Sequence, residues 1–356
     1  MTEVDYILAG QGLAGSAVAV QLLRRNKSIV VFDDPSSNNS SRIAAGLFNP
    51  VTGKKMVKTW LADTLFPYLQ RFYREVENET GEHFFHEIPL YRPFLSIEEQ
   101  NEWMARSAEP AYTPYIEKIH TQPVWGHVKN PFGGLLLKNC GYVETNRYVD
   151  AVSRLIQQRA RLIQTPLDTR EIVIEGQFIR YGEIQAKGLI ICSGVHQNKW
   201  FGWLPIRALK GETISIRNNF SEKIVVNRGV YMVPTMDSNS WRVGSTYDFH
   251  DRTEGPTGKA RKELELKTAE LFPEPFEVTG HQWGFRPTTP DRRPILGSHP
   301  VHKNIIVFNG LGTKGISLAP YFSQVLIHWL ENKGELHKEV DIERFKSLYW
   351  GSPEQI

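Results

Sequence analysis

Cysteine is scarce in this chain, which has two in 356 residues, Cys140 and Cys192. Two isolated cysteines fit neither a disulfide framework nor the paired ligand spacing of a zinc site. The eleven histidines form no HExxH pattern, and neither a Ser-His-Asp order nor a nucleophile elbow is recognisable. The sequence therefore predicts no metal ion and no hydrolase triad, and it favours a reducing, cytoplasmic setting.

A strong excess of one charge and a long hydrophobic run are absent as well. Lys and Arg number 42 against 39 Asp and Glu, which gives a formal net charge of +3 and a pI near 8.7. This balance permits anionic ligands but falls short of a nucleic-acid footprint. The apolar stretch at residues 4–23 is interrupted by three glycines, so we expect no membrane span. No basic segment precedes it, which argues against a secretory signal.

What the chain does contain, near its start, is a glycine-rich turn between a strand and a helix. Residues 4–9 are typical of a buried strand, residues 14–25 of a helix, and residues 28–32 of a second strand that ends on acidic residues. In the dinucleotide-binding βαβ unit such a turn holds a pyrophosphate at the helix N-terminus, and the carboxylate binds a ribose. The pattern therefore predicts an ADP-containing cofactor. Its expected contacts are Gly10, Gly12, Leu13, Ala14, Gly15, Asp33 and Asp34.

The rest of the chain predicts an α/β fold assembled from separated segments. Helices are expected over 59–79, 146–161, 256–272 and 316–331, and apolar strands over 185–191 and 304–308. Alternating strands typical of an antiparallel sheet are expected over 212–217, 223–227, 229–235 and 240–247. We expect a cofactor domain formed by residues 1–80, 140–210 and 280–356. The other segments, 81–139 and 211–279, are expected to form an inserted domain that covers the ligand.

Four blocks along the chain carry a family resemblance. They are residues 10–15 with Asp33, residues 40–46 (SSRIAAG), residues 190–194 (IICSG), and residues 283–297 followed by GLGTKG at 310–315. With them the chain resembles the FAD-dependent oxidoreductases of the D-amino-acid oxidase and glycine/sarcosine oxidase superfamily. The resemblance implies a Rossmann-like FAD-binding domain of the glutathione-reductase type, with an α+β substrate domain built on the antiparallel sheet. It implies non-covalent FAD, because no cysteine or histidine can be matched to the attachment sites of the covalent members.

The resemblance also implies further cofactor contacts. They are Arg42, Ala44, Ala45, Gly46, Cys192, Ser193, Gly194, Gly310, Gly312, Thr313, Lys314 and Gly315. In relatives the N-terminus of the last helix faces the flavin where negative charge develops on reduction. Lys314 either adds positive charge at that point or faces solvent.

Three residues are candidates for contact with the substrate. Arg286, in a Gly-x-Arg-Pro motif, is implied to hold a substrate carboxylate, which suits the paired donors of a guanidinium. The alternative is a structural arginine tied to Asp291 or to backbone carbonyls. Tyr231 could donate to the carboxylate or cover the amine, or it could be an ordinary half-buried tyrosine. Asn49 either faces the flavin or turns the chain before Pro50.

The implied reaction is oxidation of the C–N bond of a small amine, such as an amino acid or an N-substituted glycine, by hydride transfer to flavin N5. Oxygen or an electron carrier would then reoxidise the flavin.

One alternative is the tRNA wobble-uridine demodifying enzyme, to whose FAD domain residues 46–50 and 65–73 are similar. The basic run Lys54, Lys55 and Lys58 would then attract RNA, although a solvated face is its commoner meaning. A non-catalytic flavoprotein is a further alternative. An NAD-linked dehydrogenase is disfavoured, because the Arg286 block has no purpose in that fold.

Overall fold

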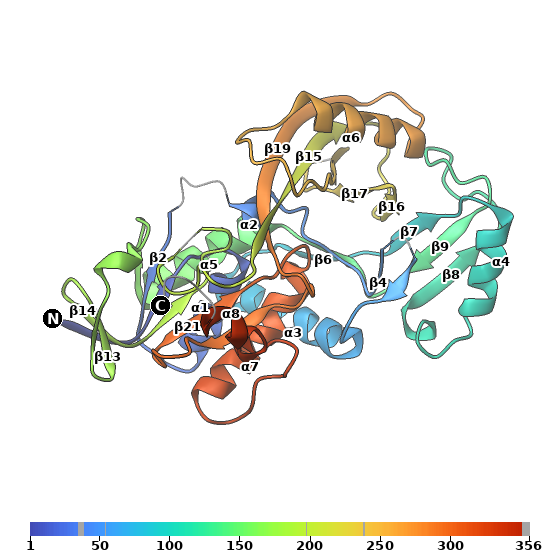
Figure 1. The fold of residues 1–356 in the computed structure, drawn as a ribbon. Coiled ribbons are helices and arrows are strands. Elements are labelled where there is room, and N and C mark those ends of the chain that lie inside the picture. The colour runs from blue at the N-terminus through green and yellow to red at the C-terminus, as the bar shows by residue number, and fades with distance from the viewer. Residues whose placement is uncertain (35–38, 54, 197, 238, 351–356) are drawn as a thin grey trace.

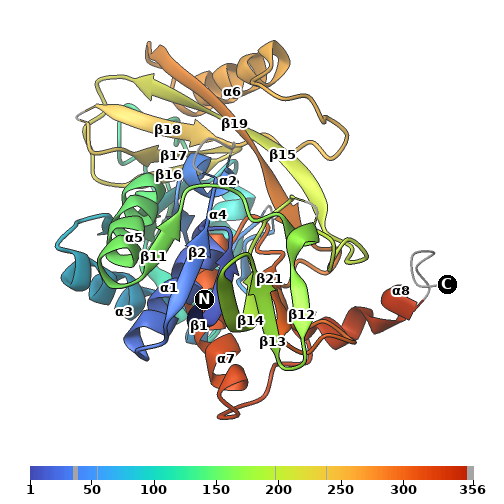
Figure 2. The same ribbon diagram turned by 90° about the vertical axis from the view of Figure 1, so that its left-hand side faces the viewer.

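The computed structural model describes residues 1–34, 39–53, 55–196, 198–237 and 239–350. Two eight-stranded sheets dominate this part of the chain (Figures 1 and 2). A three-stranded sheet and a two-stranded hairpin accompany them. The strands of these two smaller sheets are β3 (Leu47–Phe48), β10 (Gly141–Val143) and β6 (Phe85–Glu87), and then β4 (Val51–Thr52) and β5 (Val57–Lys58).

The first large sheet is parallel at its centre. Its strands are β1 (Thr2–Ala9), β2 (Ile29–Phe32), β11 (Arg161–Ile163), β12 (Val173–Glu175), β13 (Phe178–Tyr181), β14 (Ile184–Ile191), β20 (Ile295–Ser298) and β21 (Ile305–Asn309). The parallel strands lie in the order β11, β2, β1, β14, and β21 pairs with the second half of β14. β13 pairs antiparallel with the first half of β14, β12 follows β13, and β20 pairs with β21.

Helices cover one face of this sheet. The covering helices are α1 (Leu13–Arg24), α3 (Ala62–Thr80), α5 (Thr145–Arg159) and α7 (Gly315–Leu330). Their apolar residues share one core cluster with Leu8 of β1, while the adjacent Ile7 lies in a second cluster with Trp200 and Phe201 on the opposite face. Successive strand residues point to opposite faces, so a strand buried on both needs a continuous apolar run. This explains why the first strand and β14 could be predicted from local hydrophobicity.

Helix ends follow local signals. α3 ends at Gly81, whose φ of +69° is the left-handed conformation that favours glycine. α4 (Ile97–Arg106) begins after Ser96, whose hydroxyl accepts a hydrogen bond from the Glu99 N–H at 3.3 Å. α6 (Gly258–Leu271) begins in the same way after Thr257. The two shortest helices are α2 (Ser40–Ile43) and α8 (Lys346–Trp350).

The second large sheet has the strand order β19, β15, β18, β17, β16, β7, β9, β8. Its strands are β7 (Leu90–Pro93), β8 (Ile116–His120), β9 (Gly134–Leu137), β15 (Arg207–Arg217), β16 (Val225–Arg228), β17 (Val230–Pro234), β18 (Ser240–Gly244) and β19 (Glu277–Thr288). Leu264 and Leu271 of α6 pack with Ile214 and Val226 of the sheet. The expected antiparallel sheet is present, but it contains one parallel pair, β16 with β7, because the segment before residue 140 supplies three of its strands.

The longest strands, β15 and β19, pair over their whole length and connect the two halves of the molecule (Figure 2). The predicted α/β fold class is confirmed. The predicted division into two domains stays a prediction, and these two strands cross its borders at 211 and 280. Within the described residues, no helix combines the length and the apolar character that crossing a bilayer requires.

Candidate active site

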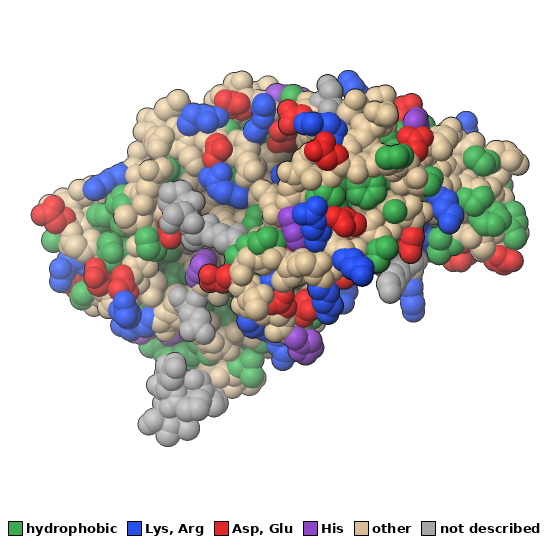
Figure 3. All heavy atoms as spheres, turned by 90° about the horizontal axis from the view of Figure 1, so that it is seen from above, with side chains coloured by type: hydrophobic (Ala, Val, Ile, Leu, Met, Phe, Trp, Pro, Cys, Tyr) green, Lys and Arg blue, Asp and Glu red, His purple; other side chains and the backbone are tan. Residues whose placement is uncertain are grey.

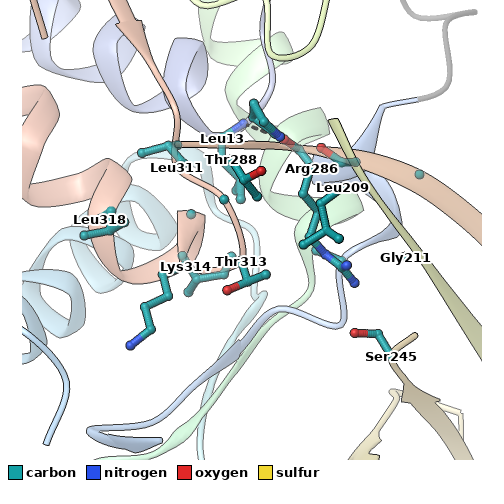
Figure 4. A pocket seen from close by; sticks show the side chains of 18 of the residues that line it. Leu13, Leu209, Gly211, Ser245, Arg286, Thr288, Leu311, Thr313, Lys314 and Leu318 are labelled. Atoms are coloured by element: carbon teal, nitrogen blue, oxygen red, sulfur yellow. Dashed lines mark hydrogen bonds between the residues drawn. The ribbon is translucent and has the colours of Figure 1, made fainter. Parts of the chain in front are cut away.

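A cavity of about 1800 Å³ lies where the two large sheets approach each other (Figure 4). The glycine turn before α1, the loop after β14, the N-terminus of α7 and strands of the second sheet line it. Small-ligand sites commonly enclose roughly 300–1,000 Å³, so this cavity has room for a large cofactor together with a substrate. All of the predicted site residues line it except Gly15 and Arg42.

The glycine turn has the close packing that a dinucleotide site needs. Gly10 has a φ of +95°, and a Cβ there would lie 2.7 Å from the carbonyl oxygen of Cys192. A Cβ on Gly15 would lie 1.8 Å from the carbonyl oxygen of Gly10, so Gly15 contributes by letting helix and turn pack together. Gly12 borders the cavity, and a side chain there would point at the Ser41 hydroxyl. The turn therefore leaves backbone exposed at the α1 N-terminus, as a bound pyrophosphate requires.

Two side chains organise this end of the cavity. The Ser41 hydroxyl accepts a hydrogen bond from the Leu13 N–H at 3.0 Å, a contact that no sequence motif predicted. Asp33 accepts one from the Gln11 N–H at 2.8 Å through Oδ1. Burial raises the pKa of Asp33 above its ordinary value, although the Gln11 hydrogen bond acts in the opposite direction. Asp33 thus lies at the expected end of β2, with its carboxyl group tied to the glycine turn.

The loop after β14 and the turn before α7 are joined by Asn309. Its Nδ2 donates to the Gly194 carbonyl at 2.8 Å, and its Oδ1 accepts from the Gly310 N–H at 2.8 Å. These two bonds hold together two segments that are 115 residues apart in the chain. Asn309 was absent from the predicted site, and the only available signal was its place immediately before the glycine run.

The implied role of Arg42 as a cofactor contact stays a prediction. Its guanidinium pairs with Asp150 of α5 at 2.7 Å, and the residue does not line the cavity. The adjoining small residues, Ala44 to Gly46, do line it. Gly46 packs so closely that a Cβ would lie 1.8 Å from the Val143 carbonyl oxygen.

Lys314 points into the cavity wall rather than into solvent (Figure 4). Its Nζ donates to the hydroxyls of Thr52 at 3.2 Å and Thr59 at 3.1 Å, and among the described residues it forms no ion pair. Burial lowers the pKa of Lys314 to about 8, and the charges of Arg293 and Arg292 add to this effect. Of the two predicted alternatives, the structure therefore favours positive charge inside the site.

Replacement of Lys314 by methionine is expected to change how stability depends on pH. The folded apoprotein binds this proton less tightly than the unfolded chain, because the pKa falls from 10.5 to about 8. The free energy of unfolding that the lysine contributes should therefore rise as pH increases from 8 to 10.5, by up to about 3 kcal/mol. Urea unfolding of both apoproteins at pH 7.5 and pH 10 tests this, with the exposed Lys129→Met as control. Equal pH slopes for wild type and Lys314→Met would contradict it.

Arg286 reaches the cavity from β19. Its guanidinium lies against Gly211 of β15, where a Cβ would be 2.0 Å from Nη1, so only glycine leaves it room (Figure 4). Its Nη1 donates to the Thr246 carbonyl at 3.3 Å, and the Tyr247 ring centroid is 5.0 Å from Cζ. Among the described residues no carboxylate pairs with it, and Asp291 pairs instead with Arg344 at 2.9 Å. The guanidinium is therefore held in place while its charge stays uncompensated.

Tyr231 and Asn49 differ in how they meet the cavity. The Tyr231 hydroxyl lies over Gly244, where a Cβ would be 2.6 Å away. Burial raises the pKa of Tyr231, while the nearby Arg286 charge acts in the opposite direction, so the phenol stays protonated. Asn49 lines the cavity, but its Nδ2 donates to the Val51 carbonyl at 3.1 Å, which fits the chain-turning alternative.

The described residues contain no cluster of three His, Cys, Asp or Glu side chains placed to hold a metal ion.

Residues 5–329 match the model of the DAO family, the FAD-dependent oxidoreductases. The chain belongs to this family. FAD is therefore its cofactor, as the sequence predicted, and the glycine cradle, the cavity volume and the positive end of α7 fit a molecule of that size and charge.

Relatives within the family differ in name and in length. Bifunctional protein ThiO/ThiG of Synechocystis sp. is 24% identical over 342 residues, which cover 90% of this chain and 50% of that protein. Glycine oxidase of Bacillus subtilis is 24% identical over 362 residues, with 92% and 93% covered. The tRNA 5-methylaminomethyl-2-thiouridine biosynthesis bifunctional protein MnmC of Idiomarina loihiensis is 23% identical, with 96% and 59% covered. The chain thus spans about half the length of the ThiO/ThiG relatives.

Solved structures show the same fold. The crystal structure of glycine oxidase from Geobacillus kaustophilus superposes with a TM-score of 0.78 at 18% identity, covering 95% of this chain and 97% of that one.

Proposed function

We propose that this protein oxidises the C–N bond of an amine that carries a carboxylate on the α-carbon, such as glycine, an N-substituted glycine or another amino acid. The observation that carries the proposal is the Arg286 guanidinium, which faces the cavity without a carboxylate partner among the described residues. An uncompensated, half-buried guanidinium is a strong binding site for a planar carboxylate. The name of the Bacillus subtilis relative, glycine oxidase, supports the same substrate class.

In this proposal FAD is held non-covalently. The residues that would hold it are Gly10, Gly12, Leu13, Ala14, Asp33, Asp34, Ala44, Ala45, Gly46, Cys192, Ser193, Gly194, Gly310, Gly312, Thr313, Lys314 and Gly315, all at the cavity. Burial raises the pKa of the Cys192 thiol, which disfavours the thiolate that covalent attachment would need. When bound, FAD supplies the acceptor for the hydride that leaves the substrate α-carbon.

The side chains then have separate tasks. Arg286 binds the carboxylate and thereby fixes the position of the α-carbon, and such alignment removes much of the entropic barrier. Tyr231 stays protonated and donates a hydrogen bond beside that carboxylate. The α7 N-terminus and Lys314 place positive charge in the cavity, which stabilises the negative charge that develops on reduction. Loss of the amine proton and hydrolysis of the resulting imine complete the reaction in water.

An anaerobic titration of the purified yellow protein tests the proposal. Flavin absorbance is followed against glycine, sarcosine, and D- and L-amino acids. Bleaching by a member of this set is the expected result, and the member that bleaches at the lowest concentration names the substrate. Lack of bleaching by all of them and by glycines with a longer N-substituent would overturn the proposal, and any bleaching would exclude a non-catalytic flavoprotein.

The tRNA-demodifying alternative rests on the name of the MnmC relative. The predicted basic run gives it little support, because Lys58 pairs with Asp63 at 2.5 Å and Lys54 lies outside the described residues. The face seen in Figure 3 carries acidic and basic side chains interspersed rather than a basic stripe. Absence of tRNA binding at low salt would exclude this alternative, whereas binding that is lost on reversing the charge of Lys55 and Lys58 would favour it.

A further inference from the structure

The second sheet presents a row of side chains to the cavity. Strand register aligns Thr213 of β15, Gly244 of β18, Tyr231 of β17 and Asn227 of β16 as successive neighbours across the sheet. β16 pairs parallel with β7, with Val226 opposite Tyr91, and extending this register by one residue brings Arg92 next to Asn227. All five residues line the cavity. The row therefore begins at β15, beside which the Arg286 guanidinium lies, and runs along the cavity wall to β7 (Figure 1 shows the strands).

Arg92, at the far end, has no hydrogen-bond or ion-pair partner in the part of the chain that the structure describes. Its guanidinium forms no hydrogen bond or ion pair with any described residue, and its Nε is buried without an acceptor. The nearby Glu99 is already occupied, because it accepts two hydrogen bonds from Arg228 at 2.8 and 2.9 Å. Burial lowers the pKa of Arg92 to about 10, and the charge of Arg228 acts in the same direction. An unpartnered guanidinium of this kind is costly unless a ligand supplies the missing acceptor.

Asn227 lies between Arg92 and Tyr231 in this row. Its side-chain amide forms no hydrogen bond with any described residue, so it can donate to and accept from a ligand. Close by, Leu90 and Leu95 give the cavity an apolar wall, and Leu95 is 67% exposed although large and hydrophobic. This end of the cavity thus combines an unused cation, an unused amide and exposed apolar surface.

The two arginines are far apart on the scale of a free amino acid. Four strand-to-strand steps separate β15, beside which the Arg286 guanidinium lies, from β7 with Arg92. At about 4.8 Å for each step, the path across the sheet between the two backbones is about 19 Å long. Glycine or sarcosine bound at Arg286 cannot reach that distance, even after allowance for the length of the Arg92 side chain.

We propose that Arg92 and Asn227 form a second anion subsite, and that the substrate is a glycine unit whose nitrogen carries a long substituent ending in an oxyanion, either a carboxylate or a phosphate. This inference rests on the proposed function, because it takes Arg286 as the site of the glycine carboxylate. The apolar wall at Leu90 and Leu95 contacts the connecting chain, and Arg92 binds the terminal anion through two parallel N–H donors.

Three synthetic probes test the subsite in the FAD-loaded protein. They are N-(7-carboxyheptyl)glycine, N-(6-phosphonohexyl)glycine, and the neutral amide N-(7-carbamoylheptyl)glycine, each titrated anaerobically against flavin absorbance in wild type and in Arg92→Gln. We expect Arg92→Gln to weaken binding of the two anionic probes by about tenfold or more and to leave binding of the neutral amide nearly unchanged. If wild type binds the carboxylate probe more tightly, the natural terminus is a carboxylate. If it binds the phosphonate probe more tightly, the terminus is a phosphate.

Matched variants separate a binding role from a structural one. Arg92→Lys keeps the charge and should recover part of the preference for the anionic probes, and Arg217→Gln at the exposed far end of β15 should change nothing. If Arg92→Gln weakens binding of all three probes equally, or of none, the proposed subsite is wrong, and the proposed function is left intact. Failure of glycine, sarcosine, the D- and L-amino acids and every probe to perturb or bleach the flavin of wild type would instead overturn the proposed function.

Discussion

Arg286→Ala is expected to retain FAD but to lower kcat/KM for a carboxylated amine by about 30- to 1,000-fold, or about 2–4 kcal/mol. The reason is that the guanidinium is half-buried and has no carboxylate of its own among the described residues, so the substrate is its natural partner. Alanine would leave the substrate carboxylate without a cation at this position. Stopped-flow bleaching of the flavin measures the loss without involving the electron acceptor.

Two comparisons make this prediction specific. An amine of similar size without a carboxylate should be oxidised slowly by wild type and no more slowly by Arg286→Ala. Arg286→Lys should fall between wild type and alanine, because an ammonium keeps the charge but not the paired donors. An unchanged kcat/KM for the carboxylated substrate in Arg286→Ala would show that Arg286 is not the carboxylate site.

Gly12→Val is expected to weaken FAD binding by about 100-fold or more, which corresponds to about 2.7 kcal/mol, and to yield a nearly colourless protein. Gly12 borders the cavity at the α1 N-terminus, and even a Cβ there would lie 2.8 Å from the Ser41 hydroxyl. A valine would therefore both displace Ser41 from the Leu13 N–H and occupy space beside the pyrophosphate. The ratio of absorbance at 450 nm to 280 nm after purification measures the FAD content.

Gly258→Val is the matched control for this variant. Gly258 opens α6, and a Cβ there would meet no atom within 4 Å, so this protein should remain yellow. Circular dichroism of Gly12→Val should retain the wild-type helix signal, since the residue precedes α1 rather than lying within it. A folded Gly12→Val protein with full FAD content would contradict the assignment of the glycine turn.

Local sequence patterns predicted four of the eight strands of the first sheet and the four helices that cover it. The second halves of β1 and β14 are buried on both faces, so they end in short apolar runs that can be recognised without knowing their neighbours. The strand β19 was not predicted, although Arg286 lies on it. Its sequence, EVTGHQWGFRPT, mixes glycine, proline and polar residues, and it is held extended by pairing with β15 along its whole length.

The candidate site was predictable only where backbone geometry governs it. Glycines at positions 10, 12 and 15, set between an apolar strand and a helix, are typical of a phosphate-binding turn, so they could be assigned from their spacing. Side chains were harder, because their direction depends on what packs beside them. Arg42 stays a predicted cofactor contact although its guanidinium pairs with Asp150, and Asn309, which joins two loops, was not foreseen.

The sequence by itself determined the FAD-binding turn, the family and the α/β fold class, because each depends on local motifs in a fixed order along the chain. Only the tertiary structure decided that the half-buried Lys314 donates to two threonine hydroxyls and that Arg286 lies over Gly211 without a carboxylate partner among the described residues. The tertiary structure alone also placed Arg92 in the same cavity, through the parallel pairing of β7 with β16. The physical reason is that burial and charge compensation arise from residues that are tens to hundreds of positions apart, whose register no local pattern records.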